Sequence, residues 1–149
     1  MLRPVGDQGQ QVVRGPLERW PRDRYGIKAL TPYEFEDFVA WLLQRDGCLD
    51  VKRVGGAGDD GVDVRGRTVL DRPVAVQCKH LSNKVSPRQV REFLGAVIAE
   101  HRDGVAVFVT SSYFTKNADE FGVAHGLVLV NMQQLVSWAG GSWSPVAGR

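Results

Sequence analysis

Two short stretches of alternating side chains, residues 62–65 and 74–79, constrain the fold of this chain more than any other feature of its sequence. Successive side chains of a β-strand point to opposite faces of the sheet, so each stretch fits a strand with one apolar and one polar face. The apolar positions are Val62, Val64, Val74, Val76 and Cys78. We predict that the two strands pair as a hairpin, whose polar faces coincide and gather Asp63, Gln77 and Lys79 into one patch.

A carboxylate, an amide oxygen and an ammonium group over one sheet form a patch that could take part in catalysis. Carboxylate and amide oxygens suit a hard cation such as Mg²⁺, and a lysine suits a phosphate group or a nucleophilic water. Most lysines on strands are solvated edge residues, and this structural role is the alternative for Lys79. The three polar groups share one face opposite an apolar one, which favours the catalytic interpretation.

Composition limits the classes of protein that the chain can belong to. Its 149 residues fit one domain, and 43% hydrophobic with 24% charged residues is an ordinary globular balance. The sequence contains no run of about 18 apolar residues, so we expect no membrane span. We also expect no secretory signal, because Met1 is followed by polar rather than apolar residues. Cys48 and Cys78 are too few for a disulfide scaffold, so we expect buried thiols in a cytoplasmic protein.

The two ends of the chain have the composition of flexible segments. Residues 1–30 carry six Lys or Arg against three Asp or Glu, with three prolines and no clear periodicity. We interpret them as a basic flexible N-terminal arm, which either adds phosphate contacts or is only a solvated tail. Residues 139–149 contain three glycines and are interpreted as a flexible tail. The folded domain is then expected over residues 31–138.

Between these ends, capping signals and hydrophobic periodicity divide the domain into helices and strands. Helices are expected after Thr31, Ser86, Thr115 and Asn131, and further strands over residues 49–54, 105–110 and 127–130. Three strands joined by short turns favour an antiparallel meander, whereas strands that alternate with helices need parallel crossovers. The predicted fold is α/β, with one mixed sheet and helices on both faces.

With these elements in order, the spacing of Gly61-Val62-Asp63 and Gln77-Cys78-Lys79 resembles the PD-(D/E)xK nuclease superfamily. Within it, the chain is most similar to the Mrr-type restriction endonuclease catalytic domain, which uses Gln-x-Lys where most relatives have Glu-x-Lys. The resemblance covers about residues 31–136. The stretches that carry it also include residues 31–36, 58–63, 85–96 and 109–118. It implies a restriction-endonuclease-like fold.

The resemblance also implies roles for individual residues. Asp63 would be the metal-binding carboxylate, and Gln77 would occupy the second metal-binding position beside the backbone carbonyl of Cys78. Lys79 would orient or deprotonate the attacking water, while the Cys78 side chain would belong to the core. Glu36 matches a helix glutamate that extends the metal shell in this superfamily, although exposed helix glutamates are often only solubilising. The implied cofactor is Mg²⁺ or Mn²⁺, and the implied reaction is phosphodiester hydrolysis.

Basic residues around this centre are weaker candidates for DNA contacts. The candidates are His80, Lys84, Arg88, Arg91 and Lys116. His80 stands where arginine is common in the family, and a half-buried histidine is an alternative to a phosphate contact. For the residues near the second helix, an ordinary solvated face is nearly as plausible as phosphate contact.

These observations favour a Mg²⁺-dependent DNA endonuclease that acts in restriction or defence against foreign or modified DNA. The alternatives are a non-cutting DNA-binding subunit of a restriction or repair complex and a structure-selective junction or repair nuclease. Cutting both strands with one site per chain favours a homodimer. Mrr-type enzymes usually carry a DNA-reading domain, which favours a separate recognition subunit as a further partner.

Overall fold

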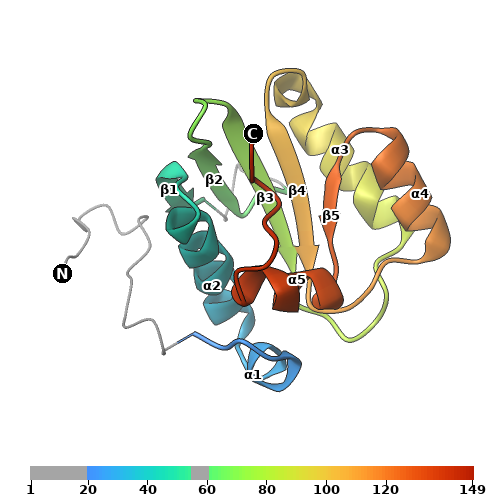
Figure 1. Ribbon diagram of the computed structural model, residues 1–149. Coiled ribbons are helices and arrows are strands. Elements are labelled where there is room, and N and C mark those ends of the chain that lie inside the picture. Colours follow the sequence, from blue (N-terminus) through green and yellow to red (C-terminus); the bar gives the residue numbers. More distant parts are fainter. Residues whose placement is uncertain (1–19, 55–60) are drawn as a thin grey trace.

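The structure, a computed structural model, describes residues 20–54 and 61–149, which form one mixed sheet covered by helices (Figure 1). The five strands lie side by side in chain order. They are β1 (Leu49–Arg53), β2 (Val64–Arg67), β3 (Pro73–Lys79), β4 (Val105–Thr110) and β5 (Val128–Val130). β1, β2 and β3 pair antiparallel, and β4 and β5 run parallel to β3. The predicted meander with parallel crossovers is confirmed.

Helices cover both faces of the sheet, as expected. They are α1 (Arg24–Lys28), α2 (Pro32–Arg45), α3 (Pro87–His101), α4 (Lys116–Ala124) and α5 (Met132–Ala139). α2 and α5 lie over one face, and α3 and α4 lie over the other (Figure 1). α1 was not expected from the sequence, because its five residues are too few to show a periodicity. Within the described residues, no helix is long and apolar enough to cross a membrane.

The predicted capping residues begin the four longer helices. Thr31 and Glu34 form a reciprocal capping box at α2, and Ser86 with Gln89 does the same at α3. The N-cap side chains of α4 and α5, Thr115 and Asn131, accept hydrogen bonds from the first turn of their helices. Each cap satisfies backbone N–H groups that have no partner inside the helix. These local signals therefore fix where each helix starts.

Two hydrophobic cores lie on the two faces of the sheet. One packs α2 and α5 against the β-strands, with Phe35, Phe38 and Trp138 among its fully buried side chains. The other packs α3 and α4 against the opposite face around Phe93 and Phe108. All residues of β4 are buried because β4 is covered on both faces.

The start of the central hairpin differs from the prediction. β2 begins at Val64, and the backbone N–H of Asp63 donates to the carbonyl of Val76 at 2.7 Å. Val76 is also the register partner of Val64, so Asp63 and Val64 both lie opposite one residue, as at a β-bulge. Val62 consequently packs in the core under α3, whereas Val64 packs under α2. The expectation that these two valines share one face was wrong, because a bulge breaks the alternation of side chains.

The packed part of the chain extends further toward the N-terminus than expected. Trp20 and Ile27 are buried in the core under α2. The Trp20 ring lies 5.7 Å from that of Phe38 and 6.3 Å from that of Trp41. The folded domain therefore includes residues before 31, from Trp20 onward among those described. The rest of the expected arm, residues 1–19, lies outside the described residues, as does the glycine loop at residues 55–60.

The expected C-terminal tail also packs against the domain. Ala139 and Val146 are buried, and Trp143 packs against the core under α2. The backbone N–H of Ser142 donates to the carbonyl of Ser137 at 3.0 Å, which closes the end of α5. The interpretation of residues 139–149 as a flexible tail is corrected. Isolated apolar residues such as Val146 pack against the core here, and they form no periodic pattern that a sequence could show.

Candidate nuclease site

The candidate site is built where β2 begins and β3 ends, and Asp63 is its best-fixed member. The Oδ2 atom of Asp63 accepts a hydrogen bond from the backbone N–H of Cys78 at 2.8 Å. The backbone carbonyl of Asp63 accepts from Val54 at 2.9 Å. A β-bulge typically re-aims a side chain. Here the bulge at Asp63 directs its carboxylate to the backbone between Gln77 and Lys79.

Glu36 of α2 lies close to this carboxylate. Its side chain is half-buried and accepts a hydrogen bond from Arg53 Nη2 at 3.4 Å. Burial raises the pKa of Glu36, the negative charge of Asp63 raises it further, and Arg53 opposes both effects. The sequence placed Glu36 only at the border of an apolar stripe, and the structure brings it to Asp63.

Arg53 is a member of this group that sequence reasoning missed. Its Nε atom lies 3.3 Å from Asp37, in addition to its bond to Glu36. The guanidinium carbon lies 3.7 Å from the centre of the Tyr33 ring, a cation–π contact. Arg53 ends β1, so no local pattern indicates that it meets the first turns of α2. The ion pairs hold Glu36 in place beside Asp63.

Gln77 and Lys79 line an open cleft between β3 and α3. The other residues that line this cleft are Gly61, Glu92 and Ala96. Gln77 is only 8% exposed, and its amide makes no hydrogen bond among the described residues. A buried amide normally has a partner, so this one is available to a ligand in the cleft. The structure thus places Gln77 and Lys79 on the α3 side and Glu36 on the α2 side, with Asp63 bonded to the backbone between them.

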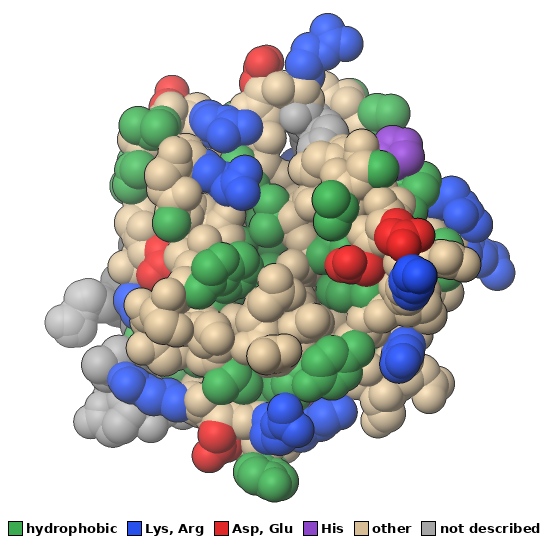
Figure 2. Space-filling model, turned by 45° about the vertical axis from the view of Figure 1, so that its right-hand side comes forward, with side chains coloured by type: hydrophobic (Ala, Val, Ile, Leu, Met, Phe, Trp, Pro, Cys, Tyr) green, Lys and Arg blue, Asp and Glu red, His purple; other side chains and the backbone are tan. Residues whose placement is uncertain are grey.

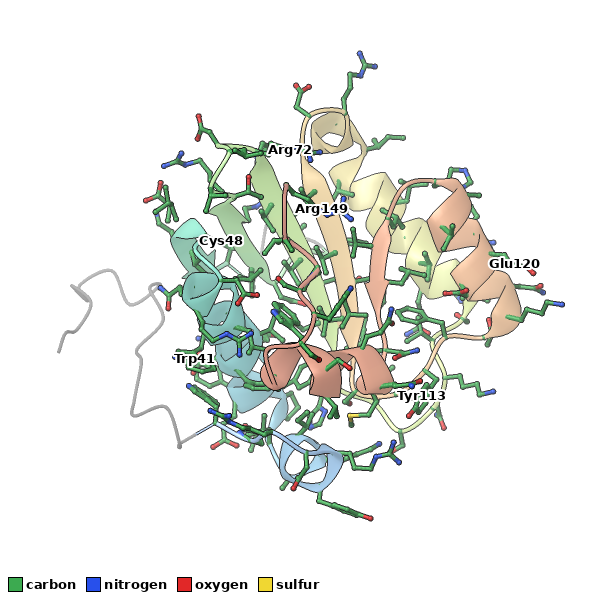
Figure 3. All side chains as sticks on the ribbon, viewed as in Figure 1. Trp41, Cys48, Arg72, Tyr113, Glu120 and Arg149 are labelled. Carbon is green, nitrogen blue, oxygen red and sulfur yellow. The ribbon has the colours of Figure 1, made fainter. Side chains whose placement is uncertain are left out.

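The two cysteines are free thiols with no nucleophilic character. The Cys78 side chain packs against the core under α2. Burial raises its pKa well above the usual value, and the charges of Asp63 and Glu36 add to this effect. Cys48 lies at the other end of α2 (Figure 3), where burial and then Asp46 raise its pKa to about 11. Both side chains remain protonated at neutral pH, as the core interpretation of Cys78 requires.

The donors at this site fit a hard divalent cation. Two nearby carboxylates, Asp63 and Glu36, repel each other, and the Gln77 amide has no other partner. Oxygen donors of these two kinds are what Mg²⁺ and Mn²⁺ bind. Within residues 20–54 and 61–149, no three His, Cys, Asp or Glu side chains converge on one point. Two carboxylates, supplemented by amide or backbone oxygens, are therefore the donors that this centre could offer to a cation.

One of the expected DNA-contacting residues is engaged inside the protein. The Nε2 atom of His80 lies 2.6 Å from the carbonyl of Leu30, and Nδ1 lies 2.7 Å from Ser111 Oγ. The ring also stacks on Phe35, with a centroid distance of 4.7 Å. Both ring nitrogens are used, so His80 is not offered to a phosphate. His80 therefore joins the segment before α2 and the segment after β4 to the end of β3.

The other expected contacts lie on the surface. Lys84, Arg88, Arg91 and Lys116 are exposed, and Arg91 also lies over the Phe121 ring of α4 at 5.9 Å from its centre. Lys84 precedes α3 and Lys116 begins α4, at the edge where β3 and β4 end (Figure 1). On the face shown in Figure 2, Lys and Arg side chains lie along the lower edge of the molecule. Arg24 of α1 adds to this edge and donates to Tyr113 Oη at 3.4 Å.

Comparison with known proteins defines the class to which this fold and site belong. Residues 27–139 match the Mrr catalytic-domain family, which is described as a restriction endonuclease. The chain belongs to this restriction endonuclease family. It is also 37% identical over 116 residues to the type IV methyl-directed restriction enzyme EcoKMrr of Escherichia coli (strain K12). That match covers 72% of this chain and 37% of the relative, so the chain spans little more than a third of the length of EcoKMrr.

Solved structures share the fold. The DNA modification-dependent restriction endonuclease AspBHI has a TM-score of 0.62 and 19% identity, covering 97% of this chain and 41% of AspBHI. The MspJI restriction endonuclease in complex with a 27-mer oligonucleotide has a TM-score of 0.53 and 20% identity. That match covers 93% of this chain and 34% of MspJI. The restriction-endonuclease-like sheet expected from the sequence is confirmed.

Proposed function

We propose that this protein is a metal-dependent endodeoxyribonuclease that cuts modified or foreign DNA. The observation that carries the proposal is the position of Asp63, with Glu36 beside it on the α2 side and Gln77 and Lys79 on the α3 side of the end of β3. The chain belongs to the restriction endonuclease family. Carboxylates, an amide oxygen and a lysine at one strand end supply the groups that phosphodiester hydrolysis needs.

Each residue has a distinct role in this proposal. Asp63, Glu36, the Gln77 amide and the backbone carbonyl of Cys78 hold the cation, Mg²⁺ or Mn²⁺. When bound, the cation lowers the pKa of a water and offsets negative charge in the transition state. Lys79 orients the attacking water and stabilises charge on the scissile phosphate. Arg53 favours the charged form of Glu36 against the effects of burial and Asp63, and it holds this side chain in position.

Modified DNA is the proposed substrate because of the relatives. EcoKMrr is a methyl-directed enzyme, and AspBHI is dependent on DNA modification. The described residues supply the cutting site and a basic edge that can meet phosphates. We infer that recognition of the modification lies outside these residues, and a separate recognition subunit is one candidate for it. A homodimer would provide one site for each DNA strand.

The experiment is incubation of the purified protein with unmethylated plasmid, methylated plasmid and branched DNA. Each is tested with Mg²⁺, Mn²⁺ or EDTA. We expect cutting of methylated plasmid that requires a cation and is abolished by EDTA. The control is Asp63→Asn, which keeps the size of the side chain and removes the charge that holds the cation. Cutting in EDTA at the same rate would contradict the mechanism, and binding without cutting would favour a non-cutting DNA-binding subunit. Preference for branched DNA would favour a junction or repair nuclease.

A further inference from the structure

An exposed aromatic ring lies within one helical turn of the proposed cation site. Tyr33 is the second residue of α2 and is 60% exposed. Glu36 follows three residues later, so the two side chains lie on one side of the helix, about 4.5 Å apart along its axis. α2 begins at the edge of the sheet where β3 ends (Figure 1). The Tyr33 ring therefore lies at the mouth of the site.

Arg53 holds this ring in one orientation. Its guanidinium carbon lies 3.7 Å from the centre of the Tyr33 ring and so covers one face of it. The same guanidinium lies 3.4 Å from Glu36 and 3.3 Å from Asp37, and the Arg53 side chain is only 18% exposed. A guanidinium held by two carboxylates has little freedom, so the ring stacked on it is held as well. The other face of the ring is the one that is open to solvent.

An open aromatic face beside a centre that cuts phosphodiesters fits a nucleobase. Bases of every identity stack on aromatic side chains, and one such contact contributes about 1–3 kcal/mol. Successive bases of a strand are about 3.4 Å apart, whereas one helical turn is about 5.4 Å. A base on Tyr33 would therefore lie one or two nucleotides from the phosphate at the cation. The alternative is that Tyr33 only shields Arg53 from water, which any apolar side chain of similar size would do.

An intact duplex offers no free base face to such a ring. Each base is stacked between its neighbours, so Tyr33 reaches a base only where the stack is open. Opening the stack costs a few kcal/mol, and the cost is smallest for a base that is unpaired or mismatched. The contribution of one aromatic contact is of similar size and offsets much of this cost.

We propose that Tyr33 is a base-stacking residue, which holds an unstacked nucleobase of the cut strand beside the scissile phosphate. The inference rests on the proposed nuclease function and narrows its substrate to DNA whose base stack is open next to the cut. Arg53 is then a positioning residue for both Glu36 and the ring. Because stacking is tolerant of sequence, this contact selects for the state of the stack and not for a particular base.

The test compares two short duplexes of the same sequence. In one duplex a 2-aminopurine is paired with thymine, and in the other it faces an abasic site. Binding is measured by fluorescence anisotropy in Ca²⁺ for wild type, Tyr33→Phe and Tyr33→Leu. We expect wild type and Tyr33→Phe to bind the open duplex about tenfold more tightly than the paired one. Tyr33→Leu should lose this preference and keep its affinity for the paired duplex.

Two further measurements separate stacking from a structural role of the ring. The emission of bound 2-aminopurine in the open duplex should be lower with wild type than with Tyr33→Leu, because stacking on an aromatic ring quenches it. The affinity for Mn²⁺, measured by calorimetry, should be equal in the two proteins. A ring that only positioned Arg53 would instead affect Mn²⁺ affinity and leave the preference for open DNA intact. The matched control is Tyr25→Leu on α1, a tyrosine that is 80% exposed, which should change none of these quantities.

The outcomes distinguish this inference from the proposed function. An unchanged preference in Tyr33→Leu, or equal weakening of its binding to both duplexes, would overturn the assignment of Tyr33 and leave the nuclease proposal intact. If preference and quenching depend on Tyr33 while the wild type cuts no DNA tested, the stacking role stands and the nuclease proposal fails. Binding to neither duplex overturns both. Thermal unfolding should differ little between the variants, because Tyr33 is exposed.

Discussion

At the scale of single residues, the site combines fixed groups with others that can still move. Asp63 is fixed by bonds to both neighbouring strands, through Val54, Val76 and Cys78. Gln77 makes no hydrogen bond among the described residues, although it is almost completely buried. Catalysis depends on groups held close to the productive geometry. We therefore expect Asp63 to define the position of the reacting phosphate and its neighbours to adjust to it.

Lys79→Ala tests the proposed chemistry at this scale. We expect the cutting rate to fall by about 10² to 10⁴-fold, because the lysine acts mainly in the transition state. Binding of the same DNA, measured by fluorescence anisotropy in Ca²⁺, should change little. Lys52→Ala, an exposed lysine on β1, is the control. If Lys79→Ala cut DNA at the wild-type rate, Lys79 would be only a solvated strand lysine with no role in catalysis.

At the scale of elements, the β-bulge and the helix that faces it set the shape of the site. Gly61 has a φ of +79°, which favours glycine, and it lies against Ala96 of α3. The backbone then bends so that Asp63 and Val64 both lie opposite Val76. The geometry of the site thus depends on a glycine that has no side chain to take part in the chemistry.

Gly61→Ala should therefore destabilise the protein. The left-handed conformation costs about 1–2 kcal/mol for a residue with a Cβ atom, and the contact with Ala96 adds to this cost. Gly95→Ala is a matched control in the same region, because its position on α3 has no atom within 4 Å of an added Cβ. There we expect a gain of about 0.5–1 kcal/mol. Chemical denaturation measures both, and equal effects would contradict this account of Gly61.

α1 offers a second test at this scale, since it packs on the domain although it lies in the expected arm. Ile27 is fully buried, so Ile27→Ala should lower the free energy of unfolding by about 2–5 kcal/mol. Tyr25 of the same helix is 80% exposed, and Tyr25→Ala should change it by less than about 0.5 kcal/mol. Thermal and urea unfolding compare the two. A harmless Ile27→Ala would mean that α1 is not part of the folded domain.

At the scale of the whole molecule, one edge of the sheet collects the features that can meet DNA. The starts of α2, α3 and α4 lie at the edge where β3 and β4 end (Figure 1). Hydrogen bonds join the segments there, for example from Ser111 to the carbonyl of Lys79 at 3.2 Å. Lys84 and Lys116 are exposed at this edge. Helix N-termini and lysines both favour phosphate groups.

We therefore expect Lys84→Ala and Lys116→Ala each to weaken binding to duplex DNA, whatever its sequence. Each should also reduce the slope of log affinity against log salt by about one, because one phosphate contact is lost. Arg102→Ala, at the opposite end of α3, should leave both quantities unchanged. Anisotropy titrations between low and moderate salt provide the measurement. Equal slopes for all three variants would place the DNA elsewhere.

The sequence by itself determined the local structure and the chemical types at the site. Capping boxes and apolar periodicity gave the helix starts, and strand spacing gave the mixed sheet, because these signals act over a few residues. The resemblance carried by Asp63, Gln77 and Lys79 indicated the family, which the comparisons confirm. Only the tertiary structure decided the bulge at Asp63, the meeting of Glu36 with Arg53, the docking of Trp20 and Ile27, and the contact of Tyr33 with Arg53. Each depends on packing between segments far apart in the chain, and no local pattern encodes such a contact.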